Sequence, residues 1–361
     1  MIADQNRRTF LATLLKIPPA LLGLDWRLVY YQDNQGAHNT ALPSENLLDL
    51  LQEESFYHYE DFLVLATEWL YIGKLMNIAN RIEQRLSKLE EAVIRAPAPE
   101  KEAWLGLLCQ YYRLATEIPR HSGTTEANKR QSLQFNAKAI KIAEEIEDQE
   151  IQIQLLLTRS GIHFEQRHIS QVRAAAYRTR QLVEKLNKRT PLYGNVQLML
   201  TPILLSDATN DTDLLKSIRH SQDKVLNTVW DKKTEPDRSL TKLTLAGVHH
   251  ERAKTFLEFQ KLYPKQDYLT DATNEMRLAW DNFSPEFASW ALYFHLTEVH
   301  LYKAQREIEQ SAQAGIEALK AARLMKSRRK EDAIVTLYQE LRGLDERNPY
   351  VRNLGVQLGM F

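Results

Sequence analysis

The sequence predicts an all-α protein, an α-solenoid of about seven helical hairpins. Apolar residues recur along most of the chain at the i, i+3, i+4 and i+7 spacing of an amphipathic helix. Only 12 of the 361 residues are glycine and few runs alternate, which leaves little for strands. The predicted helix pairs begin about every 42 to 50 residues, a spacing close to that of helical repeats.

Residues 149–189 contain the clearest hairpin. Both halves carry apolar residues on one helical face, and a short polar corner separates them. Ser160 and Gly161 in the first helix are predicted to face Ala175 and Ala176 in the second. Because a glycine inside a helix costs about 1 kcal/mol relative to alanine, Gly161 indicates that the two backbones pack closely at this point.

Helical periodicity begins at Ser44 and defines the remaining hairpins in order. Proline at or near a first helical position marks three helix starts, at Pro99, Pro191 and Pro285, two of them behind a capping hydroxyl. The predicted helix pairs are 56–76 with 79–96, 99–117 with 126–147, 149–166 with 169–188, 191–206 with 211–230, 238–260 with 267–281, 284–303 with 306–326, and 328–343 with 349–359.

Residues 1–43 are predicted to be an N-terminal segment that precedes the helical repeat domain of residues 44–361. The run from Asn6 to Leu24 is similar to a twin-arginine export signal, but Lys16 and the Pro18-Pro19 pair interrupt its apolar part. We therefore expect an amphipathic helix here, which is retained in a cytoplasmic protein. Export is the alternative.

Composition and charge disfavour several classes of function. Lys and Arg equal Asp and Glu at 47 each, so there is no surplus of positive charge for a nucleic-acid backbone. Cys109 is the only cysteine, which rules out an intrachain disulfide or a cysteine-based metal cluster and is typical of a reducing cytosol. No apolar run reaches the roughly 18 to 20 residues of a membrane span. We expect neither direct nucleic-acid binding nor membrane association.

A repeat motif lies in the segment Trp104-Leu105-Gly106-Leu107-Leu108-Cys109-Gln110-Tyr111. This segment matches the W-x2-L-x3-Y opening of a tetratricopeptide repeat, with Leu108 at a position where glycine is usual. Gly161 and Gly247 occupy the same small-residue position in later repeats. Over most of residues 55–345 the chain therefore resembles a degenerate tetratricopeptide domain, which implies a right-handed superhelical array.

The run from Arg7 to Leu24 adds a second resemblance. It is similar to the joint that follows a DNA-binding helix-turn-helix domain in bacterial cytoplasmic regulators that sense peptides. The six residues before Arg7 are too few to form such a domain, so we expect this chain to lack it. The resemblance implies a stand-alone sensor half, a fragment, or a relative of these regulators that acts through a partner.

The sequence shows no convincing catalytic or metal-binding constellation. His249-His250-Glu251 lacks the H-E-x-x-H spacing of a zinc protease. His163 and His168, with Glu165 between them, are better interpreted as solvated or core-edge residues than as metal ligands. No glycine motif for phosphate binding occurs. We therefore expect a non-enzymatic protein without a cofactor or a bound metal.

The tetratricopeptide resemblance also implies a binding groove. In these repeats, the residues one and two places after the conserved tyrosine position point into the concave face, and Arg, Gln and Glu there can bind the backbone or carboxylate of a peptide or protein segment. When these two positions are transferred to this sequence residue by residue, they predict six ligand-binding residues, Tyr112, Arg113, Glu165, Gln166, Glu251 and Arg252. Three weaker candidates are Arg159, His295 and Glu298.

Arg113, Gln166 and Arg252 are expected to line one concave wall. The alternatives are that these residues are ordinary solvent-facing positions, or that the array is an oligomerisation scaffold, for example a homodimer, without a small ligand.

Two other stretches are interpreted as structural. The aromatic residues between Phe56 and Tyr71 are predicted to form core, and the basic cluster from Lys326 to Lys330 is predicted to be a solvated turn rather than a contact for an acidic partner.

Overall fold

The computed structural model describes residues 56–166, 168–185, 190–198, 212–229 and 243–360. The chain divides into two compact units, residues 1–66 and 67–361. Only residues 56–66 of the first unit are described. The predicted N-terminal amphipathic helix, the run that is similar to an export signal and the predicted boundary at residue 43 all lie outside the described residues.

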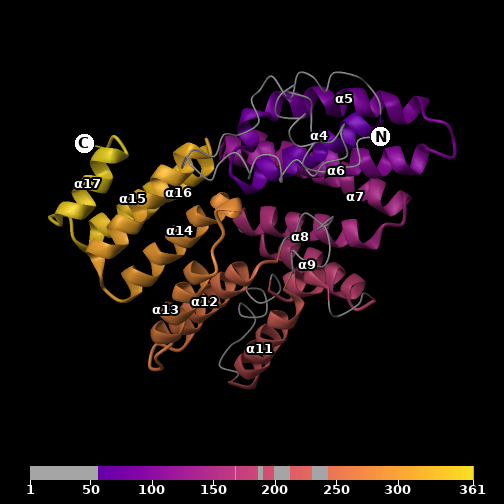
Figure 1. Ribbon diagram of the computed structural model, residues 1–361. Coiled ribbons are helices and arrows are strands. Elements are labelled where there is room, and N and C mark those ends of the chain that lie inside the picture. Colours follow the sequence, from indigo (N-terminus) through magenta and orange to yellow (C-terminus); the bar gives the residue numbers. More distant parts are fainter. Residues whose placement is uncertain (1–55, 167, 186–189, 199–211, 230–242, 361) are drawn as a thin grey trace, which may run out of the picture. The chain divides into compact units, whose positions relative to one another are not determined.

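Within the described ranges every regular element is a helix and no strand occurs, which confirms the all-α prediction (Figure 1). The α-helices are α4 (Phe56–Tyr71), α5 (Ala79–Arg95), α6 (Lys101–Ser122), α7 (Glu126–Glu145), α8 (Gln149–Glu165), α9 (Ile169–Val183), α11 (Thr212–Val225), α12 (Leu245–Leu262), α13 (Leu269–Asp281), α14 (Ala288–Ala304), α15 (Ile308–Leu324), α16 (Arg328–Leu344) and α17 (Pro349–Gln357). Short 3₁₀ turns η2 (Leu75–Asn77), η3 (Leu226–Thr228) and η4 (Pro285–Phe287) accompany them. None of the described helices has both the length and the apolar character that a bilayer crossing requires.

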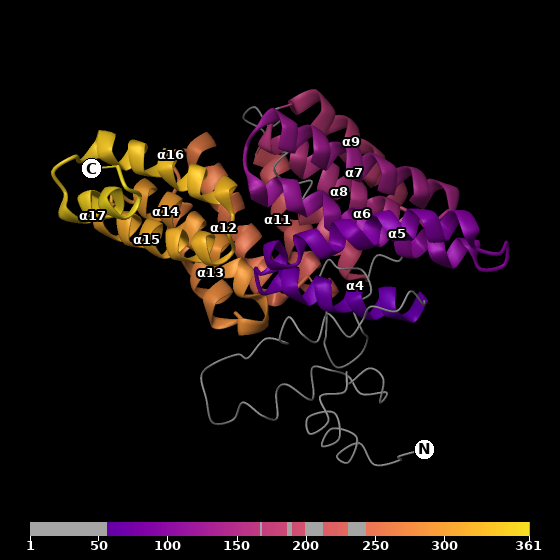
Figure 2. The ribbon, with the colours of Figure 1, turned by 90° about the horizontal axis from the view of Figure 1, so that it is seen from above.

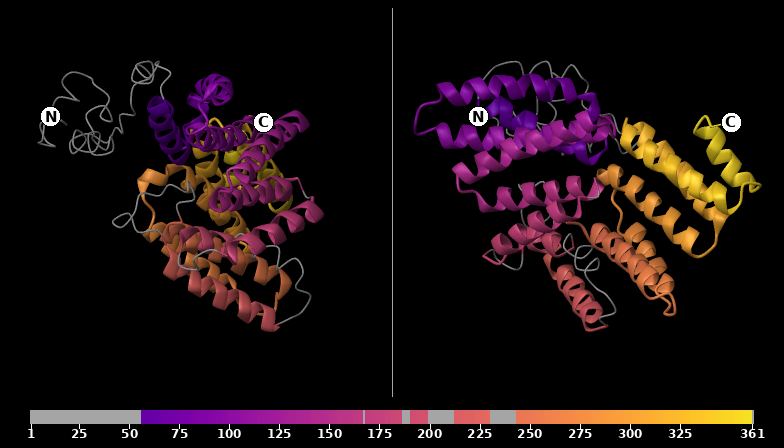
Figure 3. Two further views of the ribbon diagram at one scale, coloured as in Figure 1. Left: turned by 90° about the vertical axis from the view of Figure 1, so that its right-hand side faces the viewer. Right: turned by 180° about the vertical axis from the view of Figure 1, so that it is seen from behind.

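Helices that follow one another in the second unit pack side by side as adjacent pairs. The most extensive contacts join α6 with α7, α8 with α9, α12 with α13, and α14 with α15. Figure 2 shows α5 to α9 in this arrangement, and Figure 3 shows α12 to α15. Each amphipathic helix thereby buries its apolar face against its neighbours. The packing is that of an α-solenoid-like array.

Three of the corners between helices share one backbone geometry. The central residue of each has a positive φ, 54° at Glu147, 65° at Arg306 and 53° at Lys326. The N–H of the next residue then returns to the last turn of the preceding helix, in the bonds Asp148 N to Ala143 O, Glu307 N to Tyr302 O and Ser327 N to Ala322 O, at 2.8–3.0 Å. This pattern is a Schellman helix end, and it is built here without glycine. The next helix begins one residue later in all three cases.

The predicted helix bounds are confirmed to within a few residues over most of the described chain. One difference that matters for the candidate site is at α6, which is predicted to end at residue 117. In the structure Pro119 lies inside the last turn, and the helix continues to Ser122. This extra turn carries Arg120 and His121 into the interior of the second unit.

The prediction that the aromatic residues of α4 form core is confirmed, whereas the predicted packing of Gly161 is wrong. Tyr59, Phe62, Trp69 and Tyr71 are at most 6% exposed, so the aromatic stretch of α4 is core as predicted, although Tyr57 is exposed. In contrast, Gly161 does not face the alanine pair of the next helix. A Cβ added at Gly161 would meet only the Arg120 Nη2 within 4 Å, at 3.9 Å. The predicted close backbone contact is therefore wrong, and Gly161 leaves room for an arginine.

Gly247 shows where a glycine is required for packing. A Cβ at this position would lie 2.1 Å from Cζ3 and 2.4 Å from Cη2 of Trp290 on α14. Because overpacking of this kind typically costs 1–3 kcal/mol, we expect Gly247→Ala to lower the free energy of unfolding by about that amount in urea titrations. Trp290→Leu in the same chain should recover part of the loss. A Gly247→Ala variant as stable as the parent would contradict the close contact.

Candidate functional site

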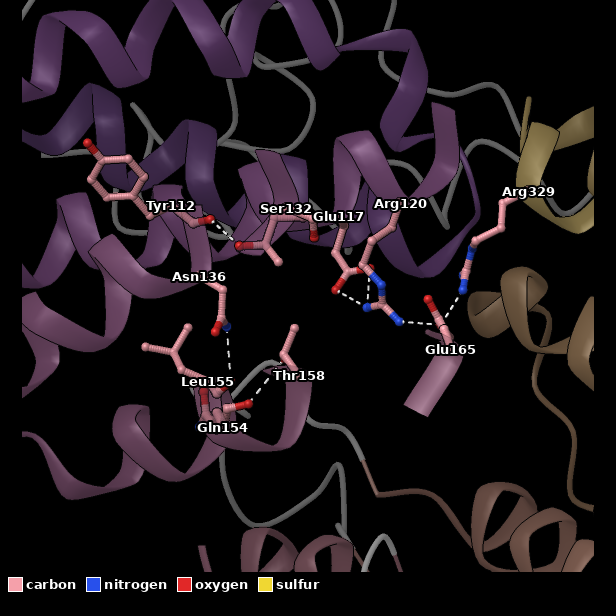
Figure 4. Close-up of polar contacts among 11 residues, drawn as sticks. Tyr112, Glu117, Arg120, Ser132, Asn136, Gln154, Leu155, Thr158, Glu165 and Arg329 are labelled. Carbon is pink, nitrogen blue, oxygen red and sulfur yellow. Dashed lines mark hydrogen bonds and ion pairs between the residues drawn. The ribbon is translucent and has the colours of Figure 1, made fainter. Parts of the chain in front are cut away.

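Helix α6 presents functional side chains in two directions. Tyr112 is 2% exposed and lies near α5 and α7. Its hydroxyl donates to the Glu90 carboxylate and lies 3.0 Å from the Lys138 ammonium. Figure 4 shows its ring pointing away from the charged residues at the other end of α6. Tyr112 therefore belongs to a structural contact and lines neither of the two pockets described below.

Arg113, the next residue, lies toward α8. It is 9% exposed, and its guanidinium donates to the Gln154 side-chain oxygen. Both residues line a pocket of about 320 Å³, together with Glu117, Arg120 and Thr158 among others. The groove interpretation expected Arg113 to line a concave wall, whereas in the structure it is packed between helices and borders the pocket.

A second pocket, of about 650 Å³, lies among α6, α7, α8, α14 and α16. It contains two of the predicted site residues, Glu165 and Gln166, at the end of α8. Its other charged lining residues include Arg120, Arg329 and Lys330. Arg120 lines both pockets, so the two pockets are neighbours that share one guanidinium.

A network of ion pairs connects three helices at this point (Figure 4). The Arg120 Nη1 donates to both Glu117 oxygens at 2.7 and 2.8 Å, and its Nη2 donates to Glu165 at 2.7 Å. Arg329 on α16 pairs with the same Glu165 oxygen from the other side. Burial disfavours the charged form of Glu165, but the two arginines outweigh it and lower the pKa of this carboxyl to about 2. Glu165 is therefore ionised at neutral pH and holds α6 and α16 together.

Lys330 follows Arg329 and is partly buried in the larger pocket. Its ammonium lies 4.2 Å from the centre of the Tyr293 ring on α14. Burial and the neighbouring cation Arg329 lower the pKa of Lys330 to about 7. Ser327 is fully buried, and its Oγ lies 3.1 Å from the His121 Nδ1. The prediction that the segment from Lys326 to Lys330 is a solvated turn is thus wrong for Ser327, Arg329 and Lys330, while Lys326 and Arg328 are exposed.

The remaining predicted residues lie in other contacts. Arg159 is partly exposed on α8 and lines neither pocket. On α12, Glu251 pairs with Lys254 at 2.7 Å, and Arg252 pairs with Asp223 at 2.6 Å and Glu275 at 2.8 Å. On α14, the His295 Nδ1 lies 2.9 Å from Glu298, which also accepts from the Trp280 indole at 2.7 Å.

The structure therefore brings together part of the predicted set. Arg113 lines the smaller pocket and Gln166 the larger one, whereas Arg252 lines neither. The residues that sequence reasoning missed are Arg120, Arg329 and Lys330. Arg120 lies seven residues after Arg113, which places both residues on the same helical face. This spacing was the one sign in the sequence that Arg120 belongs to the site. The basic cluster around Lys330 was recognised but assigned to solvent.

The two histidine pairs considered from the sequence have different surroundings. The rings of His163 and His168 lie 6.1 Å apart, and His249 and His250 have different partners, Glu275 and Thr297. No group of three His, Cys, Asp or Glu side chains among the described residues has an arrangement that could hold a metal ion.

In the comparisons with known proteins, no family model, curated protein or solved structure matched this chain.

Proposed function

We propose that this chain is a non-enzymatic, tetratricopeptide-like binding module of a bacterial cytoplasmic regulator, and that it recognises a peptide or protein segment at α6 and α8. The observation that supports this function is the pair of neighbouring pockets that share Arg120. Together they offer guanidinium donors, amide groups and carboxylates beside apolar side chains such as Leu114 and Leu157. An extended peptide needs this combination, because its backbone requires donors and acceptors while its side chains require apolar contacts.

Two buried polar atoms support the same function. The Gln166 Oε1 has no hydrogen-bond partner, although Gln166 lines the larger pocket. The Nε of Arg120 is also buried without a partner, and Arg120 lines both pockets. Buried polar groups are nearly always hydrogen-bonded in folded proteins. A bound segment with amide N–H and C=O groups would supply the missing partners.

The test is a selection of random linear heptapeptides displayed on phage, followed by affinity measurements on enriched peptides. We expect Thr158→Tyr, which fills the smaller pocket, to weaken binding at least tenfold, which corresponds to about 1.4 kcal/mol. Thr158 is a suitable position because it is partly exposed and its hydroxyl only bonds the carbonyl of Gln154 in its own helix.

The matched control is Thr273→Tyr. Thr273 is an exposed helical threonine that bonds the carbonyl four residues earlier, at Leu269, and it lies outside both pockets. Its substitution should leave the affinity unchanged. Failure to enrich any peptide, or equal affinities for Thr158→Tyr and the parent protein, would rule out a peptide site at α6 and α8.

A further inference from the structure

Charge balance in the larger pocket singles out one residue. The charged side chains that line it are the cations Arg120, Lys129, Arg329 and Lys330 and the carboxylates Glu165, Asp332 and Glu340. All but Lys330 have a partner of opposite charge. These pairs are Arg120 with Glu117 and Glu165, Arg329 with Glu165, Lys129 with Glu126, Asp332 with Arg328, and Glu340 with Lys303. Among the described residues, no carboxylate lies within ion-pair distance of the Lys330 ammonium.

The arginines beside Lys330 also have unused donors. The Nε atoms of Arg120 and Arg329 are both buried without a hydrogen-bond partner. Their side chains are only 16% and 13% exposed, so water has limited access to them. A buried donor without a hydrogen-bond partner is unfavourable, and more so if it is charged. The pocket therefore has one uncompensated positive charge and unsatisfied N–H donors on two neighbouring guanidinium groups.

We propose that this pocket is a receptor for a single carboxylate, which pairs with the Lys330 ammonium and accepts hydrogen bonds from the adjacent guanidinium groups. A ligand with one negative charge balances the one unpaired cation, whereas a doubly charged phosphate would leave an excess of negative charge. The carboxylate can come from the end of a peptide chain or from a free small acid. If the carboxylate is the end of a peptide chain, this inference rests on the proposed function. If it is a free small acid, the inference is independent of that function.

The electrostatic surroundings of Lys330 predict how binding depends on pH. The groups that act on it are Arg329 on its own helix, Arg120 on α6, Glu165 on α8, Lys254 on α12 and the Tyr293 ring on α14. Burial and the three cations lower its pKa to about 7, and Glu165 acts in the opposite direction. A bound carboxylate favours the protonated amine, so binding takes up a proton above pH 7. The affinity should therefore fall as the pH is raised from 6 to 9.

The experiment uses calorimetry or fluorescence titration of the full chain with three probes, N-acetyl-trialanine, its C-terminal amide and acetate. We expect N-acetyl-trialanine to bind and its amide to bind at least tenfold more weakly. Lys330→Met, which keeps the length of the side chain but removes its charge, should weaken binding of the acid about 10- to 100-fold. Lys330→Arg should retain most of the affinity. Acetate that binds as tightly as the peptide acid would identify a free small carboxylate as the ligand.

Lys326→Met is the matched control, because Lys326 belongs to the same basic cluster but is exposed and lies outside the pocket. Equal losses in Lys326→Met and Lys330→Met would indicate nonspecific surface attraction and overturn the receptor. Equal affinities for acid and amide, or no binding of either at millimolar concentration, would also overturn it. Failure of the proposed function is a separate result. The Thr158→Tyr comparison tests that function with uncharged as well as charged peptides, so it does not depend on the carboxylate.

Discussion

Lowering the pH from 7 to 4.5 is expected to reduce the free energy of unfolding by several kcal/mol. His121 and His250 are 5% and 6% exposed, and burial lowers the pKa of each to about 4. An unfolded histidine has a pKa of about 6.5, so between these values the unfolded chain binds more protons than the folded protein. Stability therefore falls as the pH falls through this window. Each histidine contributes at most about 2–3 kcal/mol at pH 4.5, at 1.36 kcal/mol per pKa unit.

Urea titrations at pH 7 and pH 4.5 measure this effect, and the variants His121→Gln and His250→Gln identify its source. Glutamine can keep a hydrogen bond to Ser327 or Thr297, the present partners of the two rings. It does not titrate, so each variant should lose part of the pH dependence and the double variant most of it. A double variant that is as acid-sensitive as the parent would assign the effect to other groups.

Arg120→Met is expected to destabilise the fold by about 2–4 kcal/mol. Removing one partner of a buried ion pair typically costs 3–5 kcal/mol because the remaining charge is left without compensation. The expected value is somewhat lower here, because Glu165 is 35% exposed and keeps Arg329 as a partner. Glu117, at 20% exposure, loses both of its hydrogen bonds to Arg120.

Thermal and urea unfolding of three variants would check this prediction. Arg342→Met removes an exposed ion pair with Glu346 and should change stability by less than about 1 kcal/mol. Arg120→Met combined with Glu117→Gln should recover part of the loss, because it removes one of the uncompensated carboxylates. If Arg120→Met were as mild as Arg342→Met, the ion-pair network would contribute little to the fold.

The helical array could be predicted from the sequence because it depends on local periodicity. Amphipathic spacing located α5, α7 and α8 to within a few residues, since each helix needs one apolar face. The end of α6 could not be located in this way. A proline inside a helix removes one i→i−4 hydrogen bond and usually ends the helix, but α6 continues past Pro119 to Ser122. The turn that carries Arg120 was therefore missed.

The candidate site was less predictable because it depends on contacts between distant segments. Lys326 to Lys330 reads as a solvated turn when it is considered alone. Only the approach of α6 and α8 to α16 gives Arg329 its carboxylate partner and places Lys330 in a pocket. Similarly, the groove residues were assigned by their position within a repeat. That position does not reveal that the Arg113 guanidinium is used by Gln154, or that Arg252 already has two carboxylate partners.

The contacts between α6 and α16 have a consequence for cooperativity. In a linear array each repeat touches only its neighbours, so terminal repeats can fray without affecting the other end. Here His121 and Ser327 meet across 206 residues, and Arg329 shares Glu165 with Arg120. Detaching α16 would remove one of the two cationic partners of Glu165 on α8 and the hydrogen-bond partner of the buried His121 on α6. Early and late helices of the second unit are thus energetically coupled, and they are expected to unfold in one transition, with a folding rate limited by this long-range contact.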